Sequence, residues 1–314
     1  MRSNYTYPLV EILMATFNGE KFIKEQINSI ISQSYPNWKL LIRDDGSKDK
    51  TLKIINEYTK KFPSQIFLIS NQQKHLGCCQ NFSKLLSIAK ADYIMFSDQD
   101  DIWLPNKIEI TLQKLLTLEN EYGADLPILV HTDFKVVTQD LNIIAESFWK
   151  YQGLNPTITQ FNRLLLQNIV TGCSMMINKS LKDLSTNIPP EAIMHDWWIA
   201  LVASCFGIIE YIKIPTLYYR QHTYNTIGAK KYNINYIIKK FFQFKQNKKN
   251  LEYCIKQAKA FYNIFNDKSE DKIEAAWILA NIKNYHWLKR KKLLLRNQIL
   301  KQGIVRNIGV FLFC

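Results

Sequence analysis

The stretch Tyr93-Ile94-Met95-Phe96-Ser97-Asp98-Gln99-Asp100-Asp101 places three carboxylates within four residues, directly after an apolar run. The apolar run has the composition of a buried strand, and the carboxylates mark its end. Carboxylates this close repel one another, so their pKa values rise unless a cation is present. A hard divalent ion such as Mg²⁺ or Mn²⁺ takes oxygen ligands of this kind. A solvent-exposed acidic turn that caps the next helix would also explain three acids this close together. These residues alone therefore do not distinguish a metal site from a helix cap.

The first half of the chain alternates short β-rich runs with helical patterns. This alternation is typical of an α/β fold, a mostly parallel sheet flanked by helices. The predicted strands are Leu9 to Ala15, Lys39 to Arg43, Ile66 to Ser70 and Tyr93 to Phe96. Ligands of open α/β sheets bind at the carboxyl ends of the strands. The polar clusters that follow the first, second and fourth strands are therefore the candidate binding residues.

The second half is less regular and suggests an appended unit. Strands are predicted at Leu129 to Val137 and Cys173 to Ile177, and a helix opens near His195. Beyond Tyr232 the pattern changes to Lys-rich helices, predicted at Ile234 to Phe244, Leu251 to Phe265 and Ile273 to Leu295. We expect a catalytic domain over 1–230, with a nucleotide-binding half of about 1–128 and an acceptor half of about 129–230. A basic helical region, 231–314, follows it.

The formal charge of +14 belongs to the C-terminal third, because the chain from Lys213 onward carries 21 Lys or Arg residues against 5 Asp or Glu. Lys239, Lys240 and the run Lys289 to Lys292 alternate with Phe and Leu residues, as in helices that lie on an anionic membrane surface. A solvated basic bundle is equally compatible. The basic region has no recognisable nucleic-acid module, so nucleic acid is not an expected partner. Salt-sensitive binding of RNA or DNA by residues 230–314 would instead favour the alternative that this chain is a basic nucleic-acid-binding protein.

The six cysteines form no CxxC pair, and they are interpreted as reduced thiols of a cytoplasmic protein. The N-terminal residues contain no apolar signal-peptide core, so no export route is expected. The longest apolar stretch, Trp197 to Ile209, is shorter than the roughly 20 residues that span a bilayer. The sequence predicts a cytoplasmic location with contact to the membrane surface.

Four motifs then occur in a fixed order: A-T-F-N-G from Ala15, S-I-I-S-Q-S-Y from Ser29, R-D-D-G-S from Arg43, and S-D-Q-D-D-I-W-L-P-N-K-I from Ser97. In this order they resemble the family 2 glycosyltransferases of the GT-A fold, over roughly residues 8–225. The resemblance implies a divalent metal, Mg or Mn, and a nucleotide-sugar donor. It assigns Asp45 to the nucleobase with Thr16 and Asn18 nearby, Asp98 and Asp100 to the metal–diphosphate element, and Asp101 to their support. A sugar nucleotidyltransferase would need a Gly-rich phosphate loop after the first strand, and Thr16-Phe17-Asn18-Gly19 is not one.

The resemblance also indicates where the general base lies. An inverting transfer needs a carboxylate that takes the proton from the acceptor hydroxyl. Met194-His195-Asp196-Trp197-Trp198 supplies Asp196 as this base, with Trp197 or Trp198 as a wall against which the acceptor stacks. The alternative is that Asp196 caps a buried helix whose tryptophans fill the core. Gly172, between a loop and a strand, suggests close approach of backbone to the acceptor, or a simple turn.

The segment Tyr219-Arg220-Gln221-His222 matches the family's Y-R-x-H element. It implies that Arg220 holds the donor's diphosphate and that His222 completes the metal shell, although an isolated His after a strand is often structural. Together with His131-Thr132-Asp133 and Thr171-Gly172-Cys173, this element is most similar to bacterial rhamnosyltransferases that build O-antigen or capsular chains. The branch implies dTDP-rhamnose as donor, with a UDP-hexose as the second choice. It also implies a lipid-linked oligosaccharide as acceptor.

Overall fold

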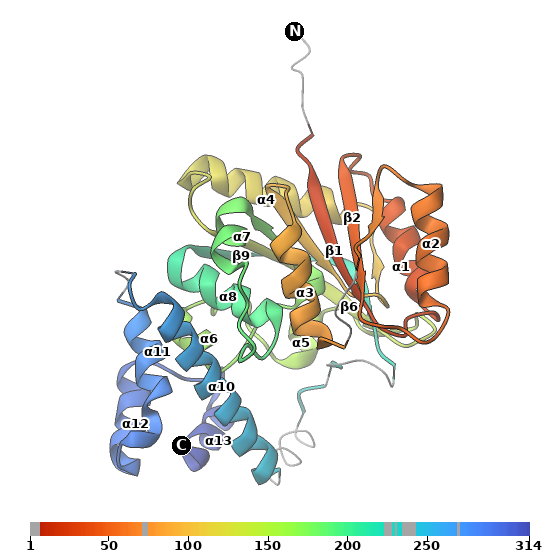
Figure 1. The fold of residues 1–314 in the computed structure, drawn as a ribbon. Helices are drawn as coiled ribbons and strands as arrows, with labels where there is room; N and C mark the ends of the chain where they lie inside the picture. Colours follow the sequence, from red (N-terminus) through yellow and green to blue (C-terminus); the bar gives the residue numbers. More distant parts are fainter. Residues whose placement is uncertain (1–6, 71–74, 223–227, 230, 234–242, 269–270) are drawn as a thin grey trace.

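A computed structural model describes residues 7–70, 75–222, 228–229, 231–233, 243–268 and 271–314 (Figure 1). Its centre is a nine-stranded sheet in the order β3-β2-β1-β4-β8-β6-β9-β5, with β7 paired to β6. The first four strands, which are mutually parallel, are β1 (Val10–Thr16), β2 (Trp38–Asp44), β3 (Ile66–Leu68) and β4 (Tyr93–Ser97). The α/β class and the positions of the four N-terminal strands were thus predicted correctly.

The remaining strands make the second half of the sheet mixed. They are β5 (Ile102–Trp103), β6 (Ile128–Val137), β7 (Ile143–Ala145), β8 (Met175–Asn178) and β9 (Ile208–Arg220). β8 runs antiparallel to both β4 and β6, whereas β6 and β9 are parallel. The sequence pattern does not reveal β9, because Glu210, Lys213 and Pro215 interrupt its apolar residues.

Helices cover both faces of the sheet. Successive side chains of β1 point alternately into the two cores that the sheet forms with these helices. Val10, Ile12 and Met14 point into one core, which they share with α1 (Ile23–Ile31), α2 (Thr51–Lys61) and α4 (Lys107–Tyr122). Leu13 points into the other core, with α3 (Gly77–Ile88) and α8 (His195–Phe206). Successive side chains of a strand face opposite sides, so a strand buried on both faces is a nearly continuous apolar run.

Three short helices connect the strands of the second half: α5 (Phe148–Gln152), α6 (Phe161–Leu164) and α7 (Lys179–Ser185). A 3₁₀ turn at Gly172–Ser174 leads into β8. The chain after β4 turns into β5, which pairs with the end of β9 through Ile102 and Tyr218. This pairing brings the acidic segment after β4 next to the residues that follow β9.

The C-terminal helices pack below α6 and α8, at the end of the molecule opposite the start of β1 (Figure 1). They are α10 (Phe244–Phe265), α11 (Ile273–Ala280), α12 (Trp287–Arg296) and α13 (Ile304–Phe313). The core under α3 and α8 continues into this unit, where Trp198 of α8 packs on Phe261 of α10. Residues 234–242, where a further helix was predicted, lie outside the described residues. Residue 230, beside the predicted domain boundary, does so too.

The prediction of one helix from Ile273 to Leu295 is wrong. The chain leaves the helix at Asn281, passes a 3₁₀ turn at Ile282–Asn284 and starts α12 at Trp287. The Asn281 side chain donates to the Trp277 carbonyl at 2.9 Å. Asn side chains that bond to nearby backbone compete with the helix, which is why apolar periodicity alone overestimates its length. No helix in the described part of the chain has both the length and the apolar character needed to cross a bilayer.

Candidate active site

A cavity of about 980 Å³ lies at the carboxyl ends of β1, β2 and β4 and reaches the C-terminal helices. This volume is at the upper end of the range of roughly 300–1,000 Å³ common for small-molecule sites. The carboxylates among its described lining residues are those of Asp45, Asp98, Asp100 and Asp196. Acidic groups from three separate segments of the sequence therefore share one cavity.

The segment after β4 gives this cavity two carboxylates and buries a third behind them. Asp98 and Asp100 line the cavity, whereas Asp101 is fully buried. Burial, and then the charges of Asp100 and Asp196, raise the pKa of Asp98 to about 7. Asp101 accepts a hydrogen bond from the backbone N–H of Arg220 at 3.3 Å. Burial and the two neighbouring aspartates raise the pKa of Asp101 as well.

A buried cation lies close to these acids. Lys107, in the first turn of α4, is fully buried and donates to Thr216 Oγ1 at 3.3 Å. Burial lowers the pKa of Lys107 to about 8, and the charge of Asp101 acts against this. Its ammonium group also lies 4.9 Å from the centre of the Trp103 ring. Lys107 belongs to the L-P-N-K-I part of the acidic motif, but the sequence alone gives no sign that it is buried.

The acidic segment fits a divalent cation at the cavity wall. Ligand atoms of Asp98, Asp101 and Cys173 lie within 4.8 Å of one another. Asp101 and Cys173 are 0% and 1% exposed and are not among the described lining residues, so of these three only Asp98 faces the cavity. Asp98 and Asp100 do face the cavity, and carboxylate oxygens are the ligands that Mg²⁺ and Mn²⁺ prefer. The pair Asp98 and Asp100 is therefore the better candidate.

His222 stands behind Asp100. Its Nε2 lies 2.7 Å from Asp100 Oδ2, and its ring stacks on Phe22 with 4.7 Å between the ring centres. His222 lies two residues after the end of β9 and is not among the described residues that line the cavity. The structure thus brings the predicted metal residues together, with His222 in contact with Asp100 rather than at the cavity surface.

Arg220 differs from its expected place at the donor's diphosphate. The side chain is 3% exposed, donates to the backbone carbonyl of Asp100 at 2.9 Å and pairs with Glu25. Its guanidinium group also lies over the Phe22 ring, 4.7 Å from the centre. Because these contacts hold the guanidinium under the acidic segment, Arg220 fixes the shape of that segment instead of facing the cavity.

The residues predicted to bind the nucleobase lie at or just after the carboxyl ends of β1 and β2. Asp45 accepts hydrogen bonds from the backbone N–H groups of Leu76 and Gly77, at 2.9 and 2.8 Å, and so anchors the start of α3. Thr16 lines the cavity and donates to Asp44 at 2.9 Å. Asn18 is not among the described lining residues, and its side-chain oxygen accepts from the Lys48 N–H at 2.9 Å. Asn18 therefore ties two loops together.

Two residues with aromatic rings, Phe17 and His75, line the cavity at the same end as Asp45. Phe17 is 46% exposed, lines the cavity and meets His75 edge to face at 6.1 Å between ring centres. The Arg43 guanidinium lies 3.6 Å from the Asp45 carboxylate and donates to the Asn81 side chain of α3 at 2.6 Å. His75 has no motif around it in the sequence, and only the fold places it beside Phe17.

Asp196 is held at the N-terminus of α8 by two donors. The backbone N–H of Gly172 donates to one of its oxygens at 2.9 Å, and the Asn168 amide donates to the other at 3.2 Å. Burial raises the pKa of Asp196 to about 6, although hydrogen bonds from the backbone N–H groups of Gly172 and Trp197 lower it. A carboxylate with this pKa is a strong enough base, and is ionised enough, to accept a proton near neutral pH.

The absence of a side chain at Gly172 makes this arrangement possible. A Cβ at Gly172 would lie 2.6 Å from Nε2 of His195, whose ring stacks on Phe82 with 4.0 Å between centres. His195 is buried, and burial lowers its pKa to about 3, so its ring is neutral. The predicted close approach at Gly172 therefore exists, but it is to His195 and Asp196.

The two tryptophans after Asp196 have different surroundings. Trp197 lines the cavity and donates from its indole N–H to the Leu164 carbonyl at 2.6 Å. Trp198 is 1% exposed and packs on Phe261 and Phe265 of α10. The acceptor wall was predicted for either residue, and only Trp197 is at the cavity.

Comparisons with known proteins identify the family of the chain. The family model "Glycosyl transferase family 2" matches residues 11–185. The dTDP-rhamnosyl transferase RfbG of Shigella flexneri is 30% identical, over 69% of this chain and 74% of that protein. An Escherichia coli protein is named UDP-Glc:alpha-D-GlcNAc-diphosphoundecaprenol beta-1,3-glucosyltransferase WfgD. It is 36% identical, over 34% of this chain and 41% of its own length.

The solved structures show the same fold. The mannosyltransferase PcManGT from Pyrobaculum calidifontis, in complex with GDP-Man and Mn²⁺, superimposes with a TM-score of 0.54 at 13% identity. The match covers 98% of this chain and 79% of that one. The predicted GT-A fold is thereby confirmed, and the family model covers more than half of the sequence. The chain belongs to glycosyltransferase family 2.

Proposed function

We propose that this chain transfers one sugar, with inversion, from a nucleotide-sugar to a hydroxyl group of a glycan acceptor in bacterial surface polysaccharide synthesis. The observation that carries the proposal is that Asp196 shares one cavity with Asp98 and Asp100 while its own pKa is raised to about 6. A single displacement at the anomeric carbon has two requirements: a general base with a pKa near neutrality on one side of the cavity, and a pair of cation ligands on the other.

Each side chain has a task in this reaction. Asp196 accepts the proton of the acceptor hydroxyl, and the Gly172 N–H and Asn168 amide keep its carboxylate in position. Trp197 offers the acceptor sugar an apolar face, and Gly172 leaves room beside it. Asp98 and Asp100 would hold Mg²⁺ or Mn²⁺, which when bound neutralises the charge of the leaving diphosphate. His222 fixes the orientation of Asp100.

The nucleobase of the donor is bound at the carboxyl ends of β1 and β2, beside the acidic segment that follows β4. Asp45 accepts the imide N–H of a pyrimidine base, beside Thr16 and the rings of Phe17 and His75. The similarity to RfbG, named a dTDP-rhamnosyl transferase, favours dTDP-rhamnose. A UDP-hexose is the second choice, which the name of WfgD supports. Thymine and uracil share the imide N–H, so Asp45 does not separate the two.

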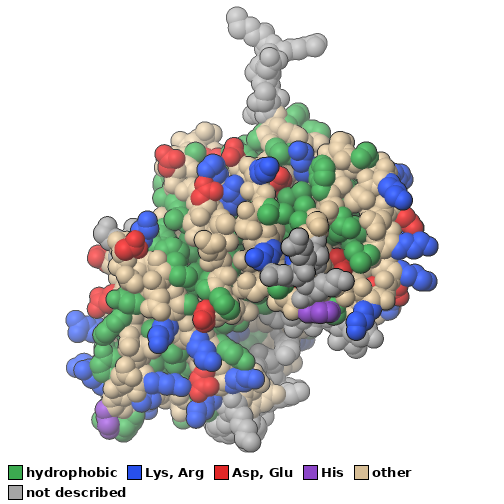
Figure 2. Space-filling view, viewed as in Figure 1, with side chains coloured by type: hydrophobic (Ala, Val, Ile, Leu, Met, Phe, Trp, Pro, Cys, Tyr) green, Lys and Arg blue, Asp and Glu red, His purple; other side chains and the backbone are tan. Residues whose placement is uncertain are grey.

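The acceptor is a lipid-linked oligosaccharide at an anionic membrane surface. The name of WfgD includes a diphosphoundecaprenol-linked acceptor. Large apolar side chains are exposed on α12 and α13, among them Trp287 (52%), Leu288 (58%) and Ile304 (82%). Figure 2 shows Lys and Arg side chains between apolar ones over these helices. Lys239, Lys240, Phe241 and Phe242 of the sequence-based proposal lie outside the described residues.

The test is a panel of nucleotide-sugars screened for thermal stabilisation with and without Mn²⁺. A ligand that binds only the native state raises the apparent stability by RT ln(1 + [L]/Kd), so the true donor stands out from the panel. We expect the largest shift with dTDP-rhamnose and a smaller one without the cation. If no nucleotide-sugar shifts the melting temperature under either condition, the proposed function is wrong.

A further inference from the structure

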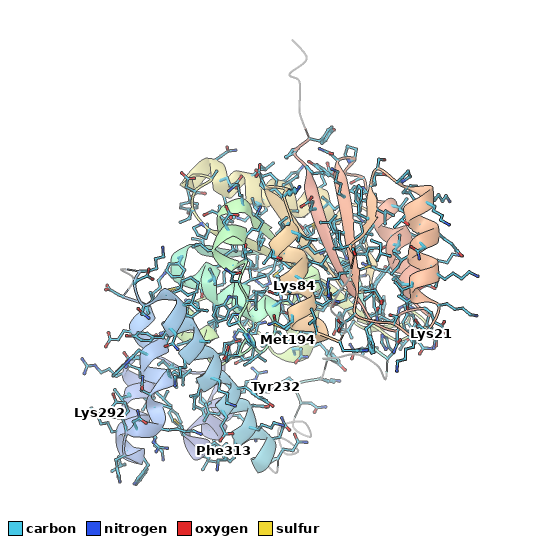
Figure 3. All side chains as sticks on the ribbon, in the orientation of Figure 1. Lys21, Lys84, Met194, Tyr232, Lys292 and Phe313 are labelled. Atoms are coloured by element: carbon cyan, nitrogen blue, oxygen red, sulfur yellow. The ribbon has the colours of Figure 1, made fainter. Side chains whose placement is uncertain are left out.

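The cavity has two ends of opposite charge. Its four carboxylates lie at the strand ends and at the start of α8. The far end is lined by the C-terminal helices through Asn247, Asn250, Leu251, Lys301, Arg306 and Val310. The described lining residues of this end include two cations and no carboxylate. Figure 3 shows Tyr232, which also lines the cavity, between Met194 and the C-terminal helices.

One of the two cations, the Arg306 guanidinium, is already hydrogen-bonded to backbone carbonyl groups. Arg306 donates to the carbonyls of Gly153 and Gln152, at 2.9 and 2.7 Å, and lies 4.0 Å from the centre of the Tyr232 ring. These contacts connect α13 to the segment after α5. The guanidinium charge still adds to the positive potential at this end of the cavity.

The other cation, Lys301, has its backbone fixed and its ammonium group available. Its N–H donates to Asn307 at 2.7 Å, and its carbonyl accepts from Arg163 at 2.8 Å. Among the residues that the structure describes, none forms a hydrogen bond or an ion pair with the Lys301 ammonium group. Burial and the charge of Arg306 lower the pKa of Lys301. A partly buried cation without an anion is unfavourable, so this site gains free energy when an anion binds.

The walls next to Lys301 are apolar. Leu251 and Cys254 of α10 and Val310 of α13 line the same end of the cavity, and all three are less than 8% exposed. Phe313, which also lines the cavity, comes from the last turn of α13. A ligand for this end therefore needs an anionic group and an adjacent apolar chain. A free nucleotide or a neutral sugar provides only one of the two features or neither.

We propose that Lys301 binds the phosphate of a phosphate-linked lipid acceptor, with Leu251, Val310 and Phe313 in contact with the apolar chain attached to that phosphate. This assignment rests on the proposed function and adds the residues that recognise the acceptor's linker. The glycan would then extend from Lys301 along the cavity, past Trp197 and toward Asp196. The C-terminal helices select the acceptor, while the strand ends select the donor.

The experiment measures binding of farnesyl diphosphate to the full chain by calorimetry, in EDTA so that no cation recruits diphosphate to Asp98 and Asp100. Inorganic diphosphate tests the anion alone, and farnesol tests the apolar chain alone. Wild-type protein, Lys301→Met, Lys301→Arg and Lys84→Met are compared. Lys84→Met is the matched control because Lys84 is exposed on α3 and is not among the described residues that line the cavity.

We expect farnesyl diphosphate to bind the wild type more tightly than either partial ligand. Lys301→Met should weaken this binding by roughly 10-fold or more, the usual effect of removing a charged hydrogen-bond partner. Lys301→Arg should keep most of the affinity, and Lys84→Met should keep all of it. Equal binding of farnesyl diphosphate by Lys301→Met and wild type would overturn the assignment. So would failure of the wild type to bind it, or equally tight binding of inorganic diphosphate.

The nucleotide-sugar panel, run on the same four proteins, separates this proposal from the proposed function. If the panel fails on the wild type while binding of farnesyl diphosphate depends on Lys301, the donor chemistry is wrong and the anion site stands. If the panel succeeds on all four proteins and Lys301→Met binds farnesyl diphosphate normally, the enzyme assignment stands and the acceptor subsite is wrong.

Discussion

His222 Nε2 lies 2.7 Å from Asp100 Oδ2, a contact between residues 122 positions apart in the sequence. The contact exists because β5 pairs with the end of β9 and brings the acidic segment to the residues that follow this strand. The Phe22 ring supports the imidazole from one side. One proposed cation ligand is thus oriented by a residue from the opposite end of the catalytic domain.

Replacing His222 should weaken metal-dependent donor binding. In His222→Ala the Asp100 carboxylate loses a partner that holds its orientation, and such supporting contacts typically contribute 10- to 100-fold to metal affinity. Titration of Mn²⁺, followed through donor-dependent thermal stabilisation, measures the change. His286→Ala is the control, because His286 is exposed on the C-terminal helices. An unchanged Mn²⁺ requirement in His222→Ala would show that the contact has no role in cation binding.

Asp196→Asn should abolish transfer and leave donor binding intact. The amide keeps the shape of the side chain and one of its two acceptor oxygens but cannot accept the proton, and general-base catalysis contributes about 10²- to 10⁴-fold. Turnover with dTDP-rhamnose and a lipid-linked acceptor gives the rate, and thermal stabilisation by the donor alone gives the binding. Near-normal turnover of the purified variant would refute the assignment of Asp196 as the base.

The pH profile of kcat/KM should show the titration of Asp196. Because its pKa is about 6 in the folded protein, the base is ionised above pH 6 and the rate falls about tenfold per pH unit below it. The stability of the folded protein should change with pH in the opposite direction to the rate. The folded carboxyl holds its proton up to a higher pH than the unfolded one, so the free energy of unfolding decreases as pH rises from about 4 to 6. Asp196→Asn should make this decrease smaller, while Asp98, whose pKa is raised to about 7, still contributes to it; urea unfolding at several pH values would measure the difference between the two proteins.

Gly172→Ala should destabilise the protein and reduce activity. The new methyl group would lie 2.6 Å from His195 Nε2, and the His195 ring cannot move away easily because it stacks on Phe82. Overpacking of this kind costs about 1–3 kcal/mol. Gly309→Ala is the control: no heavy atom lies within 4 Å of a Cβ there, and alanine favours the helix by up to about 1 kcal/mol. Denaturant unfolding should therefore move the two variants in opposite directions.

The exposed apolar residues of α13 should contribute to membrane binding. Ile304 and Ile308 lie one helical turn apart and are 82% and 44% exposed. Changing both to Ser should weaken co-sedimentation with vesicles of phosphatidylglycerol and phosphatidylcholine by roughly 10-fold or more, because each side chain gives up about 1.5 kcal/mol or more of apolar burial. Ile143→Ser on β7 is the control for an exposed Ile elsewhere. Failure of the unmodified chain to bind these vesicles at physiological salt would remove the membrane proposal.

The sequence by itself determined the α/β class, the first four strands and the acidic segment after β4. These features are local: an apolar run, a helical period and a cluster of like charges are visible within a few residues of one another. The family resemblance then placed Asp45, Asp98, Asp100 and Asp196 as candidates, and all four line one cavity.

Only the tertiary structure decided how side chains from separate segments meet. Successive helical residues point about 100° apart, so Trp197 faces the cavity while Trp198 enters the core, a choice that depends on where α10 packs. Arg220 lies under the acidic segment, where it pairs with Glu25 of α1, a residue 195 positions away in the sequence. Lys301 reaches the cavity because α13 folds back onto α10. Contacts between distant segments depend on packing, which local patterns of residues do not encode.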